Sequence, residues 1–351
     1  MVHLILFASA FIAFSKINNK RLYKVSFFII GAFAVLRYGL GNDYFSYMRC
    51  YESIRNGTND PFKREIAFTL LNKLSPSFYL LVAVLAIFFV YVVYKLLKSN
   101  LDGIYKSLGF LIFVVNPYLF LMNLSAMRQS VALCLFIISL KYARERKFIK
   151  YLLLIALATL FHTSAIILLP VYLIANDKKV GRFQMIAFLV ITIVLLSENS
   201  IVDMVITSVL DLLGNKQYEY YYSEGATNSL RATLLTGISF LYVFMNLKHL
   251  EGSRLLCGKL YLIGLLFGVL AYRVSMLTRL QMYFDIFSVV ALPSIVEYHV
   301  SAKESSIAKI IHLYGFPILI LIIYLLRYYS FFSNPMWESF GTYHTFFEAL
   351  L

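Results

Sequence analysis

The feature that most constrains this fold is a series of apolar segments, most of them near 20 residues, separated by short basic stretches. A helix that crosses the hydrocarbon core of a membrane needs about 20 apolar residues. Hydrophobic residues make up 60% of the chain and charged residues only 14%, which does not suit a water-soluble surface. The sequence therefore predicts an all-α, polytopic membrane helical bundle. Candidate helices cover 1–15, 25–41, 77–97, 107–122, 125–143, 151–175, 184–197, 231–247, 259–276, 280–297 and 309–329.

The formal net charge of +14 comes from lysines and arginines that mostly fall between these segments. Short cytoplasmic loops of membrane proteins are enriched in such residues. We therefore expect the lipid bilayer, not nucleic acid, to be the partner of this positive charge. The clusters expected on the cytoplasmic side lie at 16–24, 95–106, 141–150, 177–182, 248–259 and 303–309.

A broken pair of helices around His162 allows all the basic clusters to lie on the cytoplasmic side. If the clusters at 141–150 and 177–182 are both cytoplasmic, the chain between them must enter the membrane and return. Two short arms, 151–161 and 164–176, achieve this with a hinge at 162–164, and such breaks are tolerated where they line a protein-buried or watery cavity. The result is about 12 transmembrane segments with both termini outside.

We expect one integral membrane domain over residues 1–351, because no repeat or linker divides the chain. Two larger outer loops cover 42–76 and 198–230. An interfacial helix is expected in the first loop, with Glu65 at its N-terminal end. Cys50, Cys134 and Cys257 lie far apart, which favours neither disulfides nor a metal cluster. We expect no metal and no cofactor.

Five arginines stand at predicted outer helix ends or in short outer turns. An arginine at the bilayer centre costs about 2.5–3.5 kcal/mol on insertion scales and is retained with a partner. The planar guanidinium suits phosphate oxygens, so their convergence would favour a diphosphate ligand. Alternatively, each arginine reaches lipid headgroups or pairs with Asp43, Glu65 or Asp285. The five are Arg37, Arg128, Arg231, Arg273 and Arg279.

Asp43, Tyr47 and Tyr51 follow one another at intervals of four residues, which places them on one stripe of a helix. A carboxylate and phenols suit a sugar hydroxyl surface. An interfacial aromatic belt also explains the two tyrosines, and Asp43 has a possible partner in Arg37.

His162 is the histidine at the predicted outer-facing hinge. A neutral imidazole there could accept a proton from an attacking hydroxyl, since its reference pKa lies near 6.5. The alternative is a hydrogen-bonded structural histidine at a helix break.

Several loose motifs occur in an order that resembles the EpsG/Wzy-like polysaccharide polymerases, relatives of the O-antigen polymerase and ligase group. The resemblance is strong over residues 30–175 and continues weakly through Arg273, Arg279 and Tyr283. The motifs are Arg37-Tyr-Gly-x-Gly-x-Asp43-Tyr44-x-x-Tyr47, Glu65-x-Ala-Phe68, Met127-Arg128-Gln129 and Phe161-His162-x-Ser164-Ala165.

The resemblance implies a glycosyltransferase at the outer face of the bacterial inner membrane. Its donor and acceptor would be undecaprenyl-diphosphate-linked oligosaccharides, joined into O-antigen lipopolysaccharide, exopolysaccharide or capsule without a metal, with a chain-length regulator protein as a candidate partner. The expected reaction is an inverting displacement. Expected catalytic residues are His162 as general base, Arg128 and Arg279 on the leaving diphosphate, and Asp43 as reserve base. Expected substrate-binding residues are Arg37, Tyr44, Tyr47, Glu65, Gln129, Arg231, Arg273 and Tyr283.

Other functions fit part of this pattern. A lipid-linked oligosaccharide exporter, or flippase, would also be a bundle of about 12 helices with cavity arginines, but it would carry cations through the membrane depth and often shows repeated halves. An O-antigen ligase-type transferase would perform the same step on a different acceptor. A membrane acyltransferase would also use a histidine at a membrane face.

Overall fold

A computed structural model describes residues 1–15, 20–58, 62, 64–181, 190, 230–271, 277–301 and 310–348. The chain forms two compact units: unit 1 contains Met1–Asn176 and Leu321–Leu351, and unit 2 contains Asp177–Ile320. The predicted helix at 184–197 falls almost wholly outside the described residues, as does the predicted loop at 198–230. The single integral domain stays a prediction.

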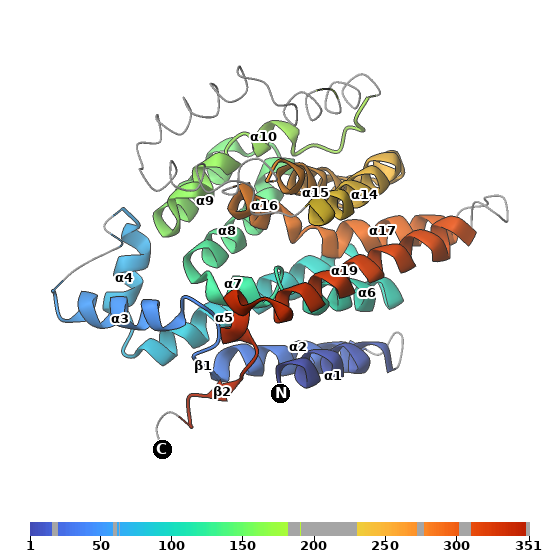
Figure 1. The fold of residues 1–351 in the computed structure, drawn as a ribbon. Coiled ribbons are helices and arrows are strands. Elements are labelled where there is room, and N and C mark those ends of the chain that lie inside the picture. The colour runs from blue at the N-terminus through green and yellow to red at the C-terminus, as the bar shows by residue number, and fades with distance from the viewer. Residues whose placement is uncertain are drawn as a thin grey trace. The chain divides into compact units, whose positions relative to one another are not determined.

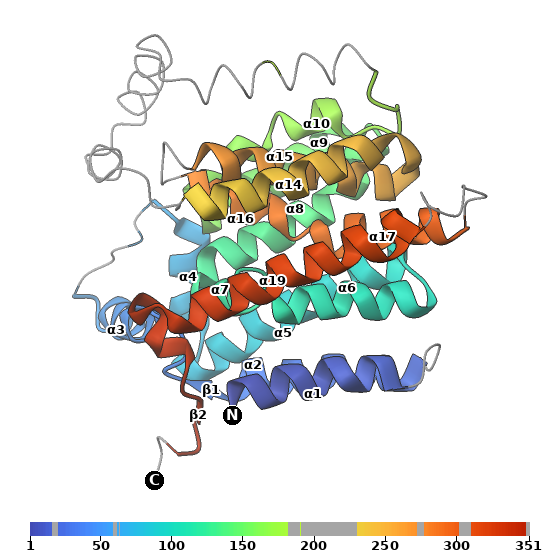
Figure 2. The ribbon, with the colours of Figure 1, turned by 45° about the vertical axis from the view of Figure 1, so that its right-hand side comes forward.

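Unit 1 is built on six helices that pack in pairs, some of them adjacent in sequence and others not. α1 packs against α2 and α6, α2 against α5, α5 against α8, and α8 against α9. Both views show α1 and α2 side by side (Figures 1 and 2). These helices are α1 (Val2–Ser15), α2 (Lys20–Leu36), α5 (Phe78–Asn100), α6 (Gly103–Val115), α8 (Met127–Arg144) and α9 (Phe148–Phe161).

Short connections at 100–103 and 144–148 reverse the chain at the same end of unit 1. Near this end the Ser107 hydroxyl donates to the carbonyl of Ala13 at 2.7 Å. The opposite end carries α3 (Tyr44–Arg55), α4 (Ile66–Leu74) and the short α7 (Leu121–Ser125). The basic connections of unit 1 and the polar motifs therefore lie at opposite ends of its helices.

The predicted break after residue 161 is confirmed. Helix α9 ends at Phe161, and a 3₁₀ helix, η1 (Thr163–Leu168), and α10 (Val171–Ile174) follow. The Tyr151 hydroxyl donates to the carbonyl of Leu168 at 2.5 Å, and the rings of Phe148 and Tyr172 lie 5.0 Å apart. The second arm therefore returns along the first.

Several predicted helices differ in extent from the structure. The helix expected at 25–41 spans Lys20–Leu36, so it ends before Arg37, and the one expected at 259–276 spans Gly252–Leu270. The helix expected at 107–122 ends at Val115, because Pro117 disfavours helical backbone at Asn116. The helix expected at 280–297 is two helices, α16 (Leu277–Asp285) and α17 (Ser288–Ser301), bent by 51°.

Unit 2 is organised around α15 (Gly252–Leu270), which packs against α14 (Leu230–Asn246), α16 and α17. Gly264 and Gly268 allow the close approach of α16. A Cβ at Gly264 would lie 2.9 Å from Asp285 Oδ1, and one at Gly268 would lie 2.8 Å from Gln281 Nε2. The short 3₁₀ helix η2 (Leu247–His249) joins α14 to α15, and the π-helix η3 (Ile311–Gly315) also belongs to this unit.

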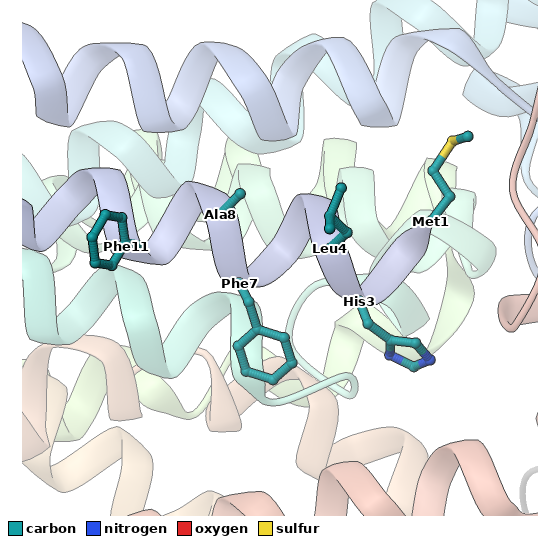
Figure 3. Close-up of a pocket in the computed structure, with 6 residues that line it drawn as sticks. All are labelled: Met1, His3, Leu4, Phe7, Ala8 and Phe11. Atoms are coloured by element: carbon teal, nitrogen blue, oxygen red, sulfur yellow. The ribbon is translucent and has the colours of Figure 1, made fainter.

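In the described part, Phe78–Asn100 and Gly252–Leu270 are long and apolar enough to cross a membrane, and the bent α16–α17 pair could form a third span. Several shorter apolar helices accompany them. The surface is also apolar: an open hollow along α1 is lined by Met1, His3, Leu4, Phe7, Ala8 and Phe11 (Figure 3). The chain is therefore an integral membrane protein, and the number of about 12 segments stays a prediction.

The last part of unit 1 contains α19 (Phe316–Ser333), of which the residues from Leu321 belong to this unit, and then residues 334–348, called here the C-terminal segment. This segment holds a 3₁₀ helix, η4 (Pro335–Phe340), and strand β2 (His344–Thr345). β2 pairs antiparallel with β1 (Arg37–Tyr38), with Arg37 opposite Thr345. Figures 1 and 2 show the two strands side by side.

Candidate active site

Glu65 is the centre of a polar cluster at the end of unit 1 that carries α3 and α4. Its side chain is buried, and Oε1 accepts hydrogen bonds from His162 Nδ1 at 2.9 Å and from the backbone N–H of Thr163 at 3.3 Å. Oε2 accepts from Arg128 Nη1. One carboxylate therefore joins the start of α4, the first turn of α8 and the hinge after α9. The Glu65 cluster is the name used here for Glu65, His162, Arg128, Tyr47 and Phe62.

Arg128 is fixed on three sides within this cluster. In addition to its ion pair with Glu65, its Nε donates to the Tyr47 hydroxyl at 3.1 Å. Its guanidinium carbon lies 4.4 Å from the centre of the Phe62 ring, a cation–π distance. The side chain is 27% exposed, so a ligand could still reach it.

His162 is the residue that ends α9. Its backbone is extended (φ −154°, ψ 114°), and its side chain is 19% exposed. Because a carboxylate only accepts hydrogen bonds, Nδ1 carries a proton, and a neutral imidazole then has its lone pair on Nε2. Among the described residues Nε2 has no hydrogen-bond partner, so this lone pair is available.

The charges of the cluster support one another. Burial raises the pKa of the Glu65 carboxyl, but hydrogen bonding from His162 and the charge of Arg128 outweigh it, so the pKa lies below its ordinary value. Burial raises the pKa of the Tyr47 phenol despite the nearby Arg128. The carboxylate is therefore ionised at neutral pH, whereas the phenol keeps its proton.

A second group of predicted residues lies beside α7. Arg37 is 2% exposed, and its guanidinium donates to the carbonyls of Ala34 and Leu124. Tyr44 is buried and its hydroxyl donates to the Arg37 carbonyl at 3.4 Å. Asp43 is exposed, and its backbone N–H donates to Ser125 Oγ at 3.3 Å. The alternative ion pair between Arg37 and Asp43 is not formed.

The remaining predicted residues lie on other elements. Gln129 is buried next to Arg128 on α8. In unit 2, Arg279 is exposed and Tyr283 buried on α16. Arg273 lies outside the described residues, and Arg231 is in α14 with a side chain that is not described. That these four side chains of unit 2 and the Gln129 amide belong to the same site as the Glu65 cluster stays a prediction.

Sequence reasoning missed three contributors to this end of unit 1. Phe62 stacks on Arg128, the Thr163 N–H binds Glu65, and Ser125 supports the backbone of Asp43. A single aromatic residue, a backbone N–H and a single serine leave no pattern in a sequence. Tyr51 donates to the Ser75 carbonyl at 2.8 Å and is buried, so it supports the loop.

In the described ranges, no three His, Cys, Asp or Glu side chains lie close enough together to hold a metal ion. The fold and the cluster define an integral membrane helical protein with a carboxylate–histidine–arginine site at one end of a helical unit. A family model matches residues 20–345, and the chain belongs to the EpsG family, which is associated with exopolysaccharide biosynthesis. No curated protein and no solved structure gives a significant match.

Proposed function

We propose that this chain is a polysaccharide polymerase, a membrane glycosyltransferase that joins undecaprenyl-diphosphate-linked oligosaccharide repeat units at the outer face of the cytoplasmic membrane. The observation that carries the proposal is the Glu65 carboxylate, which orients His162 and Arg128 at once. A transfer from a diphosphate needs a base for the acceptor and a cation for the leaving group. The cluster offers both within one site.

His162 is the general base on the acceptor. His162 Nδ1 keeps its proton and donates it in the hydrogen bond to Glu65, so Nε2 is the atom that accepts the proton of the acceptor hydroxyl. The hydroxyl oxygen attacks the anomeric carbon of the donor from the face opposite the diphosphate, and the new glycosidic bond forms with inversion. The partial exposure of His162 leaves room for the sugar. Asp43, which is exposed, is the reserve base.

Arg128 stabilises the departing diphosphate. The bond between the anomeric carbon and the phosphate oxygen breaks, and its electron pair stays on undecaprenyl diphosphate. A guanidinium fixed in advance by Glu65, Tyr47 and Phe62 needs little reorganisation as this charge develops. Arg273 and Arg279 supply further positive charge, and Arg231, Tyr283, Gln129 and Tyr44 help to form the substrate site. No metal takes part in this scheme.

The test is conversion of a purified lipid-diphosphate repeat unit by the protein in detergent with EDTA present, resolved as a ladder on a gel. The parental chain should form a ladder. His162→Ala should lower the rate at least 100-fold, because general-base catalysis contributes about 10²–10⁴-fold. Arg128→Ala and Arg279→Ala should also lower it strongly. Arg49→Ala, an exposed arginine on α3, is the matched control and should keep the parental rate.

Three results would contradict the proposal. Parental rates for folded Arg128→Ala and Arg279→Ala variants would remove the arginines from the mechanism. An unconverted substrate that instead crosses liposome membranes would identify an exporter. Transfer of one preformed glycan to another acceptor, without a ladder, would identify a ligase.

A further inference from the structure

The C-terminal segment is bound to the glycine loop that follows β1. The backbone N–H of Gly41 donates to the Ser339 carbonyl at 3.3 Å, and Asn42 Nδ2 donates to the Met336 carbonyl at 2.9 Å. The Ser339 hydroxyl donates to Asn42 Oδ1. Gly41 has φ +98°, and a Cβ there would lie 2.8 Å from the Ser125 side chain and 3.3 Å from the Phe340 ring. The loop is thus held between α7 and the C-terminal segment.

The same segment continues over the end of α2. The Tyr343 ring stacks on Phe33 at 4.5 Å, and its hydroxyl donates to the Phe33 carbonyl at 2.9 Å. The backbone N–H of Phe346 donates to the Leu36 carbonyl at 3.0 Å. Arg37, which follows Leu36, is paired with Thr345. The C-terminal segment therefore covers the stretch of chain that contains Arg37.

Arg37 is a buried cation without an anion. Its guanidinium donates only to two backbone carbonyls, and its buried Nε has no hydrogen-bond partner. Among the described residues, no carboxylate forms an ion pair with it. A buried charge is costly unless it is paired and fully hydrogen-bonded. The guanidinium thus has a charge and a donor that a ligand could use.

We propose that the C-terminal segment is a removable strap over an anion site at Arg37, and that the diphosphate of the lipid-linked substrate occupies this site when the strap is displaced. The inference rests on the proposed polymerase function. Arg37 binds the carbonyl of Leu124, which lies in α7 four residues before Arg128, so an opened site would lie at the same end of unit 1 as the Glu65 cluster. The strap is held by a ladder of two residue pairs, by a few hydrogen bonds and by the aromatic contacts of Tyr343 and the buried Phe340.

The chain contains its own reporter of the strap. Trp337 is the single tryptophan, and its ring stacks on Phe331 at 5.3 Å with an interplanar angle of 5°. Displacement of the strap removes this stacking and changes the emission. Farnesyl diphosphate added to the protein in detergent should change the Trp337 emission to saturation, and Arg37→Gln should weaken this response at least tenfold. Arg49→Gln is the control.

Two further ligands test which kind of anion the site binds. Inorganic pyrophosphate should give a weaker response at the same site, whereas phosphatidylglycerol should give none. A response to phosphatidylglycerol equal to that of farnesyl diphosphate would overturn the diphosphate assignment. Binding of radiolabelled farnesyl diphosphate without any change in emission would overturn the strap.

A disulfide staple separates this inference from the proposed function. Asn42→Cys combined with Ser339→Cys, with Cys50 replaced by serine, should lock the strap when oxidised and reduce farnesyl diphosphate binding at least tenfold, with recovery in dithiothreitol. Asn42→Cys alone is the control. Ladder formation by the oxidised protein at the parental rate would overturn the strap and leave the polymerase proposal intact. An emission change that the staple abolishes, in a chain that forms no ladder, would support the strap and contradict the polymerase.

Discussion

At the scale of single residues, the position of Glu65 is set by the start of α4. Its backbone N–H donates to the Phe62 carbonyl at 2.7 Å, and its carbonyl accepts from the N–H groups of Phe68 and Thr69 at 3.0 and 3.1 Å. Helix α4 also packs against α9, which ends at His162. A functional side chain held by a rigid element keeps its geometry better than one on a free loop.

Glu65→Gln should lower stability in a pH-dependent way. The pKa of Glu65 is lower in the folded state than in the unfolded chain, so its carboxylate stabilises the fold above the unfolded pKa of about 4.3. That contribution is lost as the pH falls through the lowered folded value. At pH 7 the variant should be less stable by about 1–3 kcal/mol, and the difference should shrink on acidification towards pH 3.

Thermal unfolding in detergent from pH 3 to pH 8 measures this difference. Glu52→Gln, at an exposed carboxylate on α3, should follow the parental curve. If the stability difference between the parental chain and Glu65→Gln stays constant from pH 3 to pH 8, the ionised Glu65 carboxylate is not its source.

At the scale of elements, the hairpin of α9 with η1 and α10 presents His162. Tyr151→Phe removes the only side-chain hydrogen bond described between the two arms, the one from its hydroxyl to the Leu168 carbonyl. The buried carbonyl then loses its partner, which should cost about 1–3 kcal/mol. The expected result is a lower unfolding temperature in detergent. Tyr91→Phe, at an exposed tyrosine on α5, should leave it unchanged; equal effects of both variants would contradict a specific link.

The elements differ in how well the sequence predicts them. Long apolar runs identify α5 and α8. The break at His162 is identified because the basic clusters on either side of residues 151–176 can both be cytoplasmic only if the chain between them returns to the side from which it entered. The bend between α16 and α17 falls at Ile286 and Phe287, where apolar residues without proline or glycine give no signal. The contact between Glu65 and His162 spans 97 positions, and the two-residue pairing of β1 with β2 is too short for any periodicity, so neither follows from local pattern.

At the scale of the whole molecule, the basic connections predict the orientation of unit 1. In a background with Cys50 replaced by serine, Glu52→Cys on α3 should react with a membrane-impermeant maleimide added to intact cells. Glu145→Cys, in the connection between α8 and α9, should react only after permeabilisation. The expected contrast is at least tenfold, because Cys134 and Cys257 are buried. If Glu145→Cys reacts in intact cells and Glu52→Cys does not, the orientation is the opposite of the predicted one.

The division of the chain has a consequence for biosynthesis. Unit 1 consists of residues 1–176 and 321–351, with the whole of unit 2 between them. Strand β1 leaves the ribosome early, yet its partner β2 is translated about 300 residues later. Pairing of β1 with β2 must therefore wait, with the chain near Arg37 uncovered, until the second unit has been synthesised. A nascent chain stalled before residue 334 would carry every member of the Glu65 cluster but no strap.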